Sequence, residues 1–281
     1  FELPARGVFV REPSGQVHGG TPSVAPAGIL SAVSSEARYG VTLSAGNTLR
    51  LAFGTNGLAR LTVAQPVEAA RLVLRNHPAP SVVTLDGTPV QADQPCNTLR
   101  QGLNEICRQT VPFRLEAGEH ALAIAAGGSD TNYFLPVAFL VGDFAVEQGV
   151  VKALPKTVGA GALWRQGLSN FAGSVTYTAQ VEVPGQAGDL TLRLYTGGLY
   201  TSVVLDGQAL GARAWEPFEW TVPAALKGKK GELKITVWTS VAPLFGDWKT
   251  PESAWSKKFW VPPPEHHPEV GLLRPPEWIL E

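Results

Sequence analysis

Apolar and polar side chains alternate along several short segments of the chain, and this alternation predicts β-strands. The longest such segment, residues 174–183, places Val175, Tyr177, Ala179, Val181 and Val183 on one face and Ser, Thr, Gln and Glu side chains on the other. Shorter segments of the same kind lie at residues 48–53, 60–63, 71–75, 120–124, 190–194 and 232–238. A strand with one buried and one solvated face has this period. Helix-like periodicity does not extend beyond two turns anywhere, so we expect an all-β fold.

A Leu-Asp-Gly tripeptide occurs twice, with Asp86 in the first copy and Asp206 in the second, 120 residues apart. Each copy follows a β-branched run, and each is followed by a Pro-Phe pair that ends in Phe113 or Phe218. Asp followed by Gly is typical of a two-residue hairpin turn, in which Gly accepts a positive φ. Because the matching neighbours occur in the same order, the chain is predicted to contain one sandwich domain made twice.

This repeat predicts the division of the chain. We expect an extended lead-in at residues 1–28, a first antiparallel β-sandwich at 29–150 and a second at 151–281, which ends in a Pro-rich tail. The interval from Asp to Phe is 27 residues in the first copy and 12 in the second, so the first copy carries an insertion of 15 residues. Cys96 and Cys107, which are the chain's two cysteines, lie inside that insertion.

A disulfide between Cys96 and Cys107 would order this long loop, and it would place the protein in an oxidising compartment, secreted or periplasmic. Two reduced, buried thiols are the alternative.

The composition limits the kinds of partner that the protein is expected to bind. Charged residues make up 17% of the chain and the formal net charge is −1, so no basic segment is available to neutralise phosphates and nucleic acid is an unexpected partner. No apolar run approaches the roughly 20 residues of a membrane span. The 30 Gly, 23 Pro and 8 Trp suit a turn-rich β-protein with flat aromatic surfaces.

Motifs of catalysis are missing from the sequence: nucleophile elbows, phosphate-binding loops, dinucleotide fingerprints and the zinc-binding His-Glu-x-x-His. Glycoside hydrolysis needs two carboxylates on either side of the scissile bond. The acids that look least like ordinary surface residues are Asp143, Glu216, Glu219 and Asp247, although a solvated strand end is the usual explanation of Glu216 and Glu219 and a turn cap that of Asp143. A calcium site at Asp130 and Asn132, in a Gly-rich turn, is a further option beside a plain polar turn.

The aromatic residues of the second half suggest a binding site more directly. Sugar rings have apolar faces and hydroxyl edges, so a site for them combines aromatic platforms with charged or amide groups. The residues with this character are Trp164, Arg165, Tyr200, Trp215, Asp247 and Trp248. Large aromatics that close the ends of a sandwich are the alternative interpretation of each one.

The second half also resembles a known family. The order of Gly173 and Tyr177, then Leu205-Asp206-Gly207, then Pro217-Phe218 is similar to that of the sugar-binding β-sandwich of glycoside hydrolase family 2. Residues 139–144 and 270–273 resemble the C-terminal accessory region of α-L-rhamnosidase-type enzymes such as family 106, although residues 274–276 (Arg-Pro-Pro) depart from its usual ending. This resemblance covers roughly residues 135–275. It implies a galactose-binding-like jelly roll and a catalytic glycoside hydrolase domain that lies outside this chain.

The sequence therefore predicts non-catalytic binding of a polysaccharide or oligosaccharide by an accessory region of a secreted polysaccharide-degrading enzyme. One alternative is a stand-alone glycoside hydrolase or polysaccharide lyase that uses carboxylates between the domains. Another is a structural module that supports a neighbouring catalytic domain. No catalytic residue and no resident cofactor are expected beyond the optional calcium ion.

Overall fold

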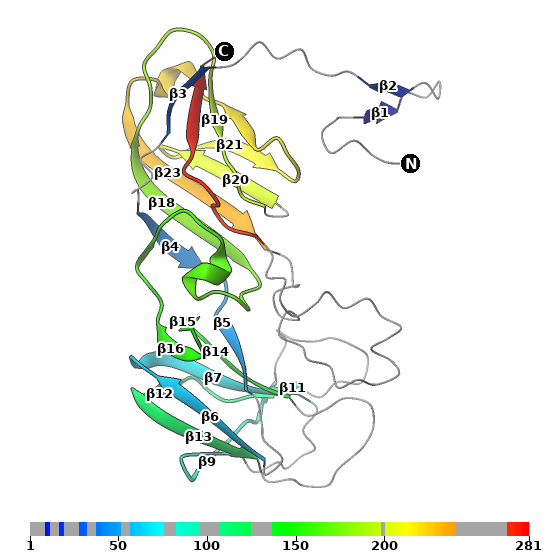
Figure 1. Cartoon of the computed structure of the whole chain (residues 1–281), viewed down its shortest axis with the longest axis vertical. Helices are drawn as coiled ribbons and strands as arrows, with labels where there is room; N and C mark the ends of the chain where they lie inside the picture. Colours follow the sequence, from blue (N-terminus) through cyan, green and yellow to red (C-terminus); the bar gives the residue numbers. More distant parts are fainter. Residues whose placement is uncertain are drawn as a thin grey trace.

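The computed structural model describes the chain in ten segments, residues 9–11, 17–19, 28–32, 38–51, 57–75, 83–95, 107–124, 137–197, 200–239 and 269–280. Within them the fold is almost entirely β, which confirms the predicted all-β class, and two antiparallel sandwiches follow one another along the long axis of the molecule (Figure 1). Two short 3-10 helices, η1 (Leu163–Gln166) and η2 (Ala224–Leu226), also occur. None of the helices in these segments is long and apolar enough to cross a membrane.

The first sandwich consists of two six-stranded sheets. One has the order β10 (Gln94–Pro95), β11 (Cys107–Gln109), β7 (Val67–Arg75), β14 (Val137–Gly142), β5 (Asn47–Leu51), and β12 (Phe113–Leu115) pairs with β7 beside β11. The other has the order β15 (Phe144–Glu147), β16 (Val150–Ala153), β6 (Leu58–Val63), β13 (Gly118–Ile124), β8 (Val83–Leu85), β9 (Thr88–Val90).

The second sandwich has one six-stranded and one four-stranded sheet. The larger has the order β17 (Thr157–Val158), β4 (Tyr39–Leu43), β18 (Ser174–Glu182), β23 (Lys230–Trp238), β20 (Tyr200–Leu205), β21 (Gln208–Arg213). The smaller has the order β22 (Glu219–Thr221), β19 (Leu190–Arg193), β24 (Glu277–Leu280), β3 (Gly28–Ala32). Strands β1 (Phe9–Arg11) and β2 (Val17–Gly19) pair with each other within the expected lead-in.

The two sandwiches share one strand order, as the repeated tripeptide predicted. The path β6-β13-β8-β9 in the first corresponds to β18-β23-β20-β21 in the second, and β12-β7-β14-β5 corresponds to β22-β19-β24-β3. The expected insertion in the first copy supplies β10 and β11. Cys96 lies outside the described residues and only the backbone of Cys107 is described, so their disulfide stays a prediction.

The chain builds the second sandwich from both of its ends, which differs from the consecutive division that the sequence suggested. Strands β3 and β4 pair with β24 and β18 of the second sandwich, although they precede the first sandwich in the chain. The chain leaves β4 at Leu43 and returns at β17, whose Thr157 and Val158 pair with Gly40 and Tyr39 of β4. The first sandwich is thus inserted into the second. The chain leaves the second sandwich from β4 and returns to it at the adjacent strand β17, and such neighbouring exit and return points tolerate an inserted domain.

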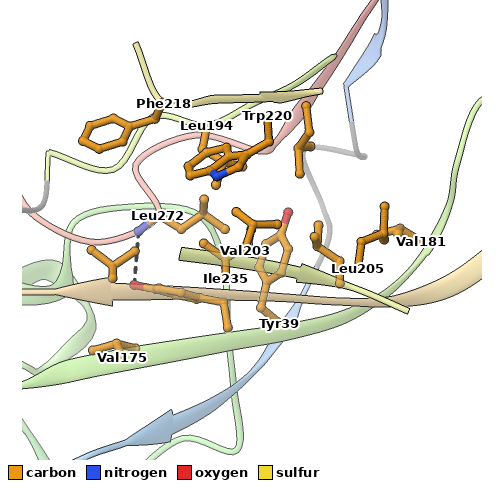
Figure 2. Packing of buried hydrophobic residues seen from close by; sticks show 14 of the residues in the cluster. Tyr39, Val175, Val181, Leu194, Val203, Leu205, Phe218, Trp220, Ile235 and Leu272 are labelled. Carbon is orange, nitrogen blue, oxygen red and sulfur yellow. Dashed lines mark hydrogen bonds between the residues drawn. The ribbon is translucent and has the colours of Figure 1, made fainter. Parts of the chain in front are cut away.

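Each sandwich has its own apolar core. Inward side chains of both sheets form one cluster in each half, and the second includes the fully buried Tyr177, Trp220 and Trp278. Figure 2 shows part of the second cluster, in which Trp220 lies among apolar side chains such as Leu194 and Val203. Burial of a large apolar side chain stabilises by roughly 1.5–3 kcal/mol. The Leu272 amide donates to the Tyr177 hydroxyl oxygen at 3.1 Å, and burial raises the pKa of Tyr177 to about 12. The C-terminal segment is thereby attached to the core.

The two Leu-Asp-Gly turns have the predicted hairpin geometry, with positive φ at both central residues. The φ angles are 51° and 79° at Asp86 and Gly87, and 48° and 76° at Asp206 and Gly207. The strand beside each turn differs between the copies. In the first, Ala121 N–H donates to Asp86 at 2.7 Å and His120 Nδ1 lies 2.7 Å from the other carboxylate oxygen.

The residue of the second copy that corresponds to His120 is Gly231. Leu122 pairs with Leu85 in the first copy and Leu233 with Leu205 in the second, and His120 and Gly231 each lie two residues before the paired leucine. A Cβ at Gly231 would lie 2.8 Å from the Asp206 Cβ. In the first copy, the turn residue Asp86 is therefore held by His120. In the second copy, the turn residue Asp206 packs against Gly231, where a larger side chain would not fit.

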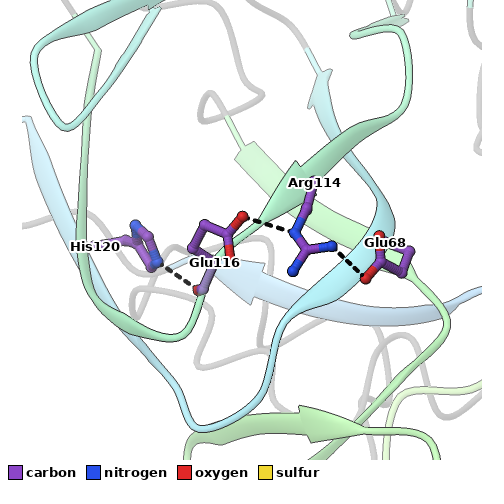
Figure 3. Close-up of polar contacts among 4 residues, drawn as sticks. All are labelled: Glu68, Arg114, Glu116 and His120. Carbon is purple, nitrogen blue, oxygen red and sulfur yellow. Dashed lines mark hydrogen bonds and ion pairs between the residues drawn. The ribbon is translucent and has the colours of Figure 1, made fainter.

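Charged side chains connect β12 to β7 on the outer surface of the first sandwich (Figure 3). Arg114 donates to Glu116 at 2.6 Å and to Glu68 at 2.8 Å, and all three side chains are more than half exposed. The His120 ring contacts the Glu116 carbonyl oxygen at 2.8 Å. Ion pairs between exposed side chains contribute little to stability because water screens them, so the apolar core dominates the stability of this half.

The contact between the sandwiches centres on Asn47 and Gly167. The buried Asn47 side-chain amide donates to the carbonyl oxygens of Phe144 and Gly167, each at 3.0 Å. Val146 N–H also donates to Gly167 O, at 2.8 Å. Gly167 ends η1 with a φ of 81°, and a Cβ there would lie 2.7 Å from the Ala145 Cβ. Glycine is required at this position both for its backbone conformation and for the close approach of the neighbouring strand.

The substitution Gly167→Ala should destabilise the protein more than Gly149→Ala. Both residues have nearly the same φ, 81° and 79°, but a Cβ at Gly149 meets nothing within 4 Å. We expect about 1 kcal/mol for the left-handed alanine in each variant, and a further 1–3 kcal/mol or so from overpacking at Gly167 alone. Urea unfolding measures both, and equal losses would contradict the close packing at Gly167.

The hairpin at Asp86 should be most stable in mildly acidic solution. Both ring partners of His120 are acceptors, so the ring donates from both nitrogens as an imidazolium. Burial opposes this charge, but the hydrogen bonds to Asp86 and Glu116 outweigh it and raise the pKa of His120 above its usual 6.5. The Ala121 amide and then His120 lower the pKa of Asp86 below its usual 3.8.

The stabilisation from His120 is therefore complete below pH 6.5 and is lost as the pH rises through its raised pKa. That from Asp86 is complete above pH 3.8 and is lost as the pH falls through its lowered pKa. The free energy of unfolding should decrease as the pH rises above about 6.5, and His120→Gln should remove this decrease. An unchanged pH profile in the variant would refute the role of the histidine.

Candidate functional site

A groove of about 370 Å³ lies at the edge of the second sandwich where β21 leads into β22. On β22 the Trp220 side chain enters the core, so Glu219 and Thr221 on either side of it point outward. Thr191 of β19 pairs with Thr221 and shares this outer face. The lining residues are Thr191, Arg213, Trp215, Pro217, Glu219 and Thr221.

Trp215 is the most exposed of the large apolar residues in the described chain, with 76% of its surface accessible. It lies in the short loop between β21 and β22, and the peptide bond from Glu216 to Pro217 that follows is cis. Phe218 and Trp220, which come next, are 4% and 1% exposed. The loop is therefore anchored to the core after Trp215, whereas the indole of Trp215 itself is free to stack on a ligand.

Charges in the groove are partly paired. Glu219 receives a 2.6 Å hydrogen bond from Nε of Arg193, its cross-strand neighbour on β19. Burial alone would lower the pKa of the Arg193 guanidinium, but the hydrogen bond to Glu219 and its negative charge outweigh this effect and raise the pKa. Arg213 lies with its guanidinium carbon 5.9 Å from the centre of the Trp220 ring. The groove thus offers an exposed indole face together with hydroxyl, carboxylate and guanidinium groups.

Tyr200, which was also predicted to bind a ligand, lies elsewhere. It pairs with Trp238 across β20 and β23, with ring centres 4.7 Å apart in an edge-to-face arrangement. The two side chains are 41% and 36% exposed on the outer face of the larger sheet. Neither residue lines the groove, which lies where β21 leads into β22. Tyr200 and Trp215 thus do not share the groove.

Trp164 and Arg165 connect η1 to the C-terminal segment. Trp164 Nε1 donates to Glu269 Oε1 at 3.2 Å, and Arg165 contacts the same oxygen at 3.3 Å. The Arg165 guanidinium lies 4.7 Å from the Trp164 ring centre. Backbone hydrogen bonds from Gly161 and Leu163 to Leu272 and Val270 support the same junction. The Trp164 and Arg165 side chains therefore fix the segment at Glu269 against η1.

Several predicted residues fall outside the described segments. Asp247 and Trp248 do so, and so do Asp130 and Asn132 of the optional calcium site. In the part of the chain that the structure describes, no three His, Cys, Asp or Glu side chains gather as they would around a metal ion.

Thr191, Arg213 and Thr221, which line the groove, were not among the residues predicted from the sequence. Each is an ordinary polar residue in a strand, and only the pairing of β19 with β22 and the path of β21 bring the three together. The exposed Trp two residues after Arg213 was the one local signal of this site.

Comparisons with known proteins give weak likenesses. No protein-family model and no curated protein sequence matches the chain. Among solved structures, a rhamnosidase from Novosphingobium sp. PP1Y aligns with 86% of this chain at 17% identity and a TM-score of 0.35. A β-glucuronidase from Faecalibacterium prausnitzii aligns with 56% at 20% identity and a TM-score of 0.30. The chain spans only 25% and 29% of the lengths of these two proteins.

Truncation of Trp164 and of Trp215 should affect stability differently. Trp164→Ala removes the hydrogen bond to Glu269 and the ring contact with Arg165, and we expect a loss of about 1–3 kcal/mol. Trp215→Ala removes an exposed side chain and should change the free energy of unfolding by no more than about 0.5 kcal/mol. Chemical denaturation of both variants tests this, and a large loss in Trp215→Ala would mean that the indole packs against the protein.

Proposed function

We propose that the chain binds carbohydrate without cleaving it, at the Trp215 groove of the second sandwich. The observation that carries the proposal is the exposed Trp215 indole beside a groove whose other lining residues, apart from Pro217, are polar or charged. A pyranose ring presents an apolar face that stacks on an aromatic ring and an edge of hydroxyls that needs hydrogen-bonding partners. Thr191, Thr221 and Glu219 supply those partners, and the indole supplies the platform.

The groove suits binding better than hydrolysis. Of the six described residues that line it, Glu219 is the only carboxylate, whereas glycoside hydrolysis uses a pair. Arg193 already holds Glu219 at 2.6 Å. Asp143 lies in the first sandwich, in the turn between β14 and β15, and is exposed. Of the described acids predicted as candidate catalysts, neither Asp143 nor Glu216 lines the groove beside Glu219, and Asp247 lies outside the described residues.

The proposal includes a setting for the protein. The chain would act as an accessory region that holds a secreted polysaccharide-degrading enzyme on its substrate, with the catalytic glycoside hydrolase domain outside residues 1–281. Support for this comes from the tandem sandwiches and from the groove on the second one. The first sandwich, inserted between β4 and β17, would act as a spacer.

Trp215→Ala should weaken carbohydrate binding by about tenfold or more, because truncation of a central tryptophan commonly costs about 2 kcal/mol in a binding site. Tyr200→Ala is the matched control, since Tyr200 is an exposed aromatic of the same sandwich outside the groove. A broad glycan array identifies the bound polysaccharide, and affinity electrophoresis in that polysaccharide compares the variants.

Absence of binding across the array would contradict the proposal and favour a purely structural role. Sugar release from the bound polysaccharide, at protein concentrations close to those of the substrate, would overturn its non-catalytic part. Equal losses in Trp215→Ala and Tyr200→Ala would place the ligand outside the groove.

A further inference from the structure

The groove contains one cation whose charge the described protein leaves unbalanced. Arg193 is neutralised by Glu219, with Nε and Oε1 2.6 Å apart. Arg213 has no acidic partner among the described residues, and its one hydrogen bond is a long one, 3.4 Å, to the carbonyl oxygen of Ala212. Of the charged residues that line the groove, Glu219 is therefore paired to Arg193, whereas Arg213 is left without an acidic partner among the described residues.

The position of Arg213 suits a ligand contact. Trp220, the indole below its guanidinium, is buried and is fixed by a hydrogen bond from Nε1 to Gly211 O at 3.2 Å. A guanidinium that lies against an aromatic ring keeps its N–H groups free at its rim. Trp215 is two residues further along the chain and lines the same groove. A planar cation and an exposed indole therefore border one groove.

We infer that the groove selects an anionic saccharide, in which a carboxylate or a sulfate ester of the sugar contacts Arg213 while the ring stacks on Trp215. This inference rests on the proposed function and specifies its ligand class. Guanidinium binds carboxylates and tetrahedral oxyanions such as phosphate through two parallel hydrogen bonds, and these are stronger than contacts between neutral groups. A neutral sugar would leave the charge of Arg213 without a partner.

The experiment uses the whole chain and matched pairs of polymers. Polygalacturonate, alginate and glucuronoxylan are each compared with their carboxyl-reduced forms, and carrageenan with its desulfated form. We expect at least one acidic polymer to bind about tenfold more tightly than its neutral form, since a hydrogen bond to a charged group commonly contributes a factor of this size. The pair that shows the difference tells carboxylate from sulfate. Binding should also weaken as the salt concentration rises.

Two arginine variants assign the effect. Arg213→Gln should bind the acidic and neutral forms alike, and Arg213→Lys should recover only part of the preference because it lacks the planar fork. Arg274→Gln is the control, since Arg274 is likewise exposed and lies 5.1 Å from an aromatic ring, that of Tyr195, but does not line the groove. It should retain the full preference. Unfolding curves establish that all three variants are folded.

The outcomes separate the two proposals. Equal binding of the acidic and neutral forms by the unmodified protein would overturn the anionic preference and leave carbohydrate binding intact. A preference that survives Arg213→Gln, or that Arg274→Gln removes to the same extent, would overturn the role of Arg213. Failure to bind any polysaccharide, acidic or neutral, would overturn the proposed function and this inference with it.

Discussion

The contact between Asn47 and Gly167 is the constraint on which the arrangement of the two halves depends. A buried side-chain amide from β5 donates to one carbonyl at the start of β15 and to another at the end of η1, so a single residue connects both sandwiches. Such a group is expensive to bury without partners, because its desolvation is not repaid. The same contact also requires glycine at position 167, because β15 passes too close to the end of η1 to leave room for a Cβ.

This contact explains how an inserted domain can hold a defined position. The first sandwich is connected to the second through the chain on either side of it, next to β4 and β17, and two connections alone would leave it free to rotate. Asn47 lies four residues after β4 ends, and Phe144 and Val146 lie near the return to the second sandwich. The buried hydrogen bonds therefore form where the inserted domain begins and ends, and there they restrict its rotation most effectively.

The sequence was sufficient to predict the local features of the fold. Alternation at residues 174–183 marks β18, and the Asp-Gly pairs mark two hairpins, because these are short-range consequences of side-chain period and turn geometry. It did not predict that β4 joins β18, whose paired residues Val41 and Tyr177 are separated by the entire first sandwich. Pairing at that distance in the chain is decided by which edges remain open after folding, and no local pattern encodes it.

Prediction of the site was limited for the same physical reason. Trp164 and Trp215 look alike in the sequence, as tryptophans in loops beside polar residues. In the structure, Trp164 is hydrogen-bonded to Glu269, because a segment far along the chain packs beside η1. Trp215 is exposed, because none of the described segments covers the β21–β22 loop. Burial of a loop aromatic depends on such returning segments. Composition alone therefore does not distinguish a loop tryptophan that is hydrogen-bonded within the fold from one that stays exposed.

Comparison of the two copies shows why the groove is on the second. Aligned through Pro112-Phe113 and Pro217-Phe218, the counterpart of Trp215 is Thr110. Thr110 is 2% exposed, and its hydroxyl and amide both bond to the backbone of Leu72 on β7. The insertion of the first copy adds β11 to the same edge of β7, and this draws the residues before the Pro-Phe pair onto the sheet. The second copy has 15 fewer residues in this interval, so its chain turns directly from β21 to β22 and Trp215 remains outside. A change in the length of one loop is thus enough to convert a buried sheet edge into an open groove with an aromatic wall.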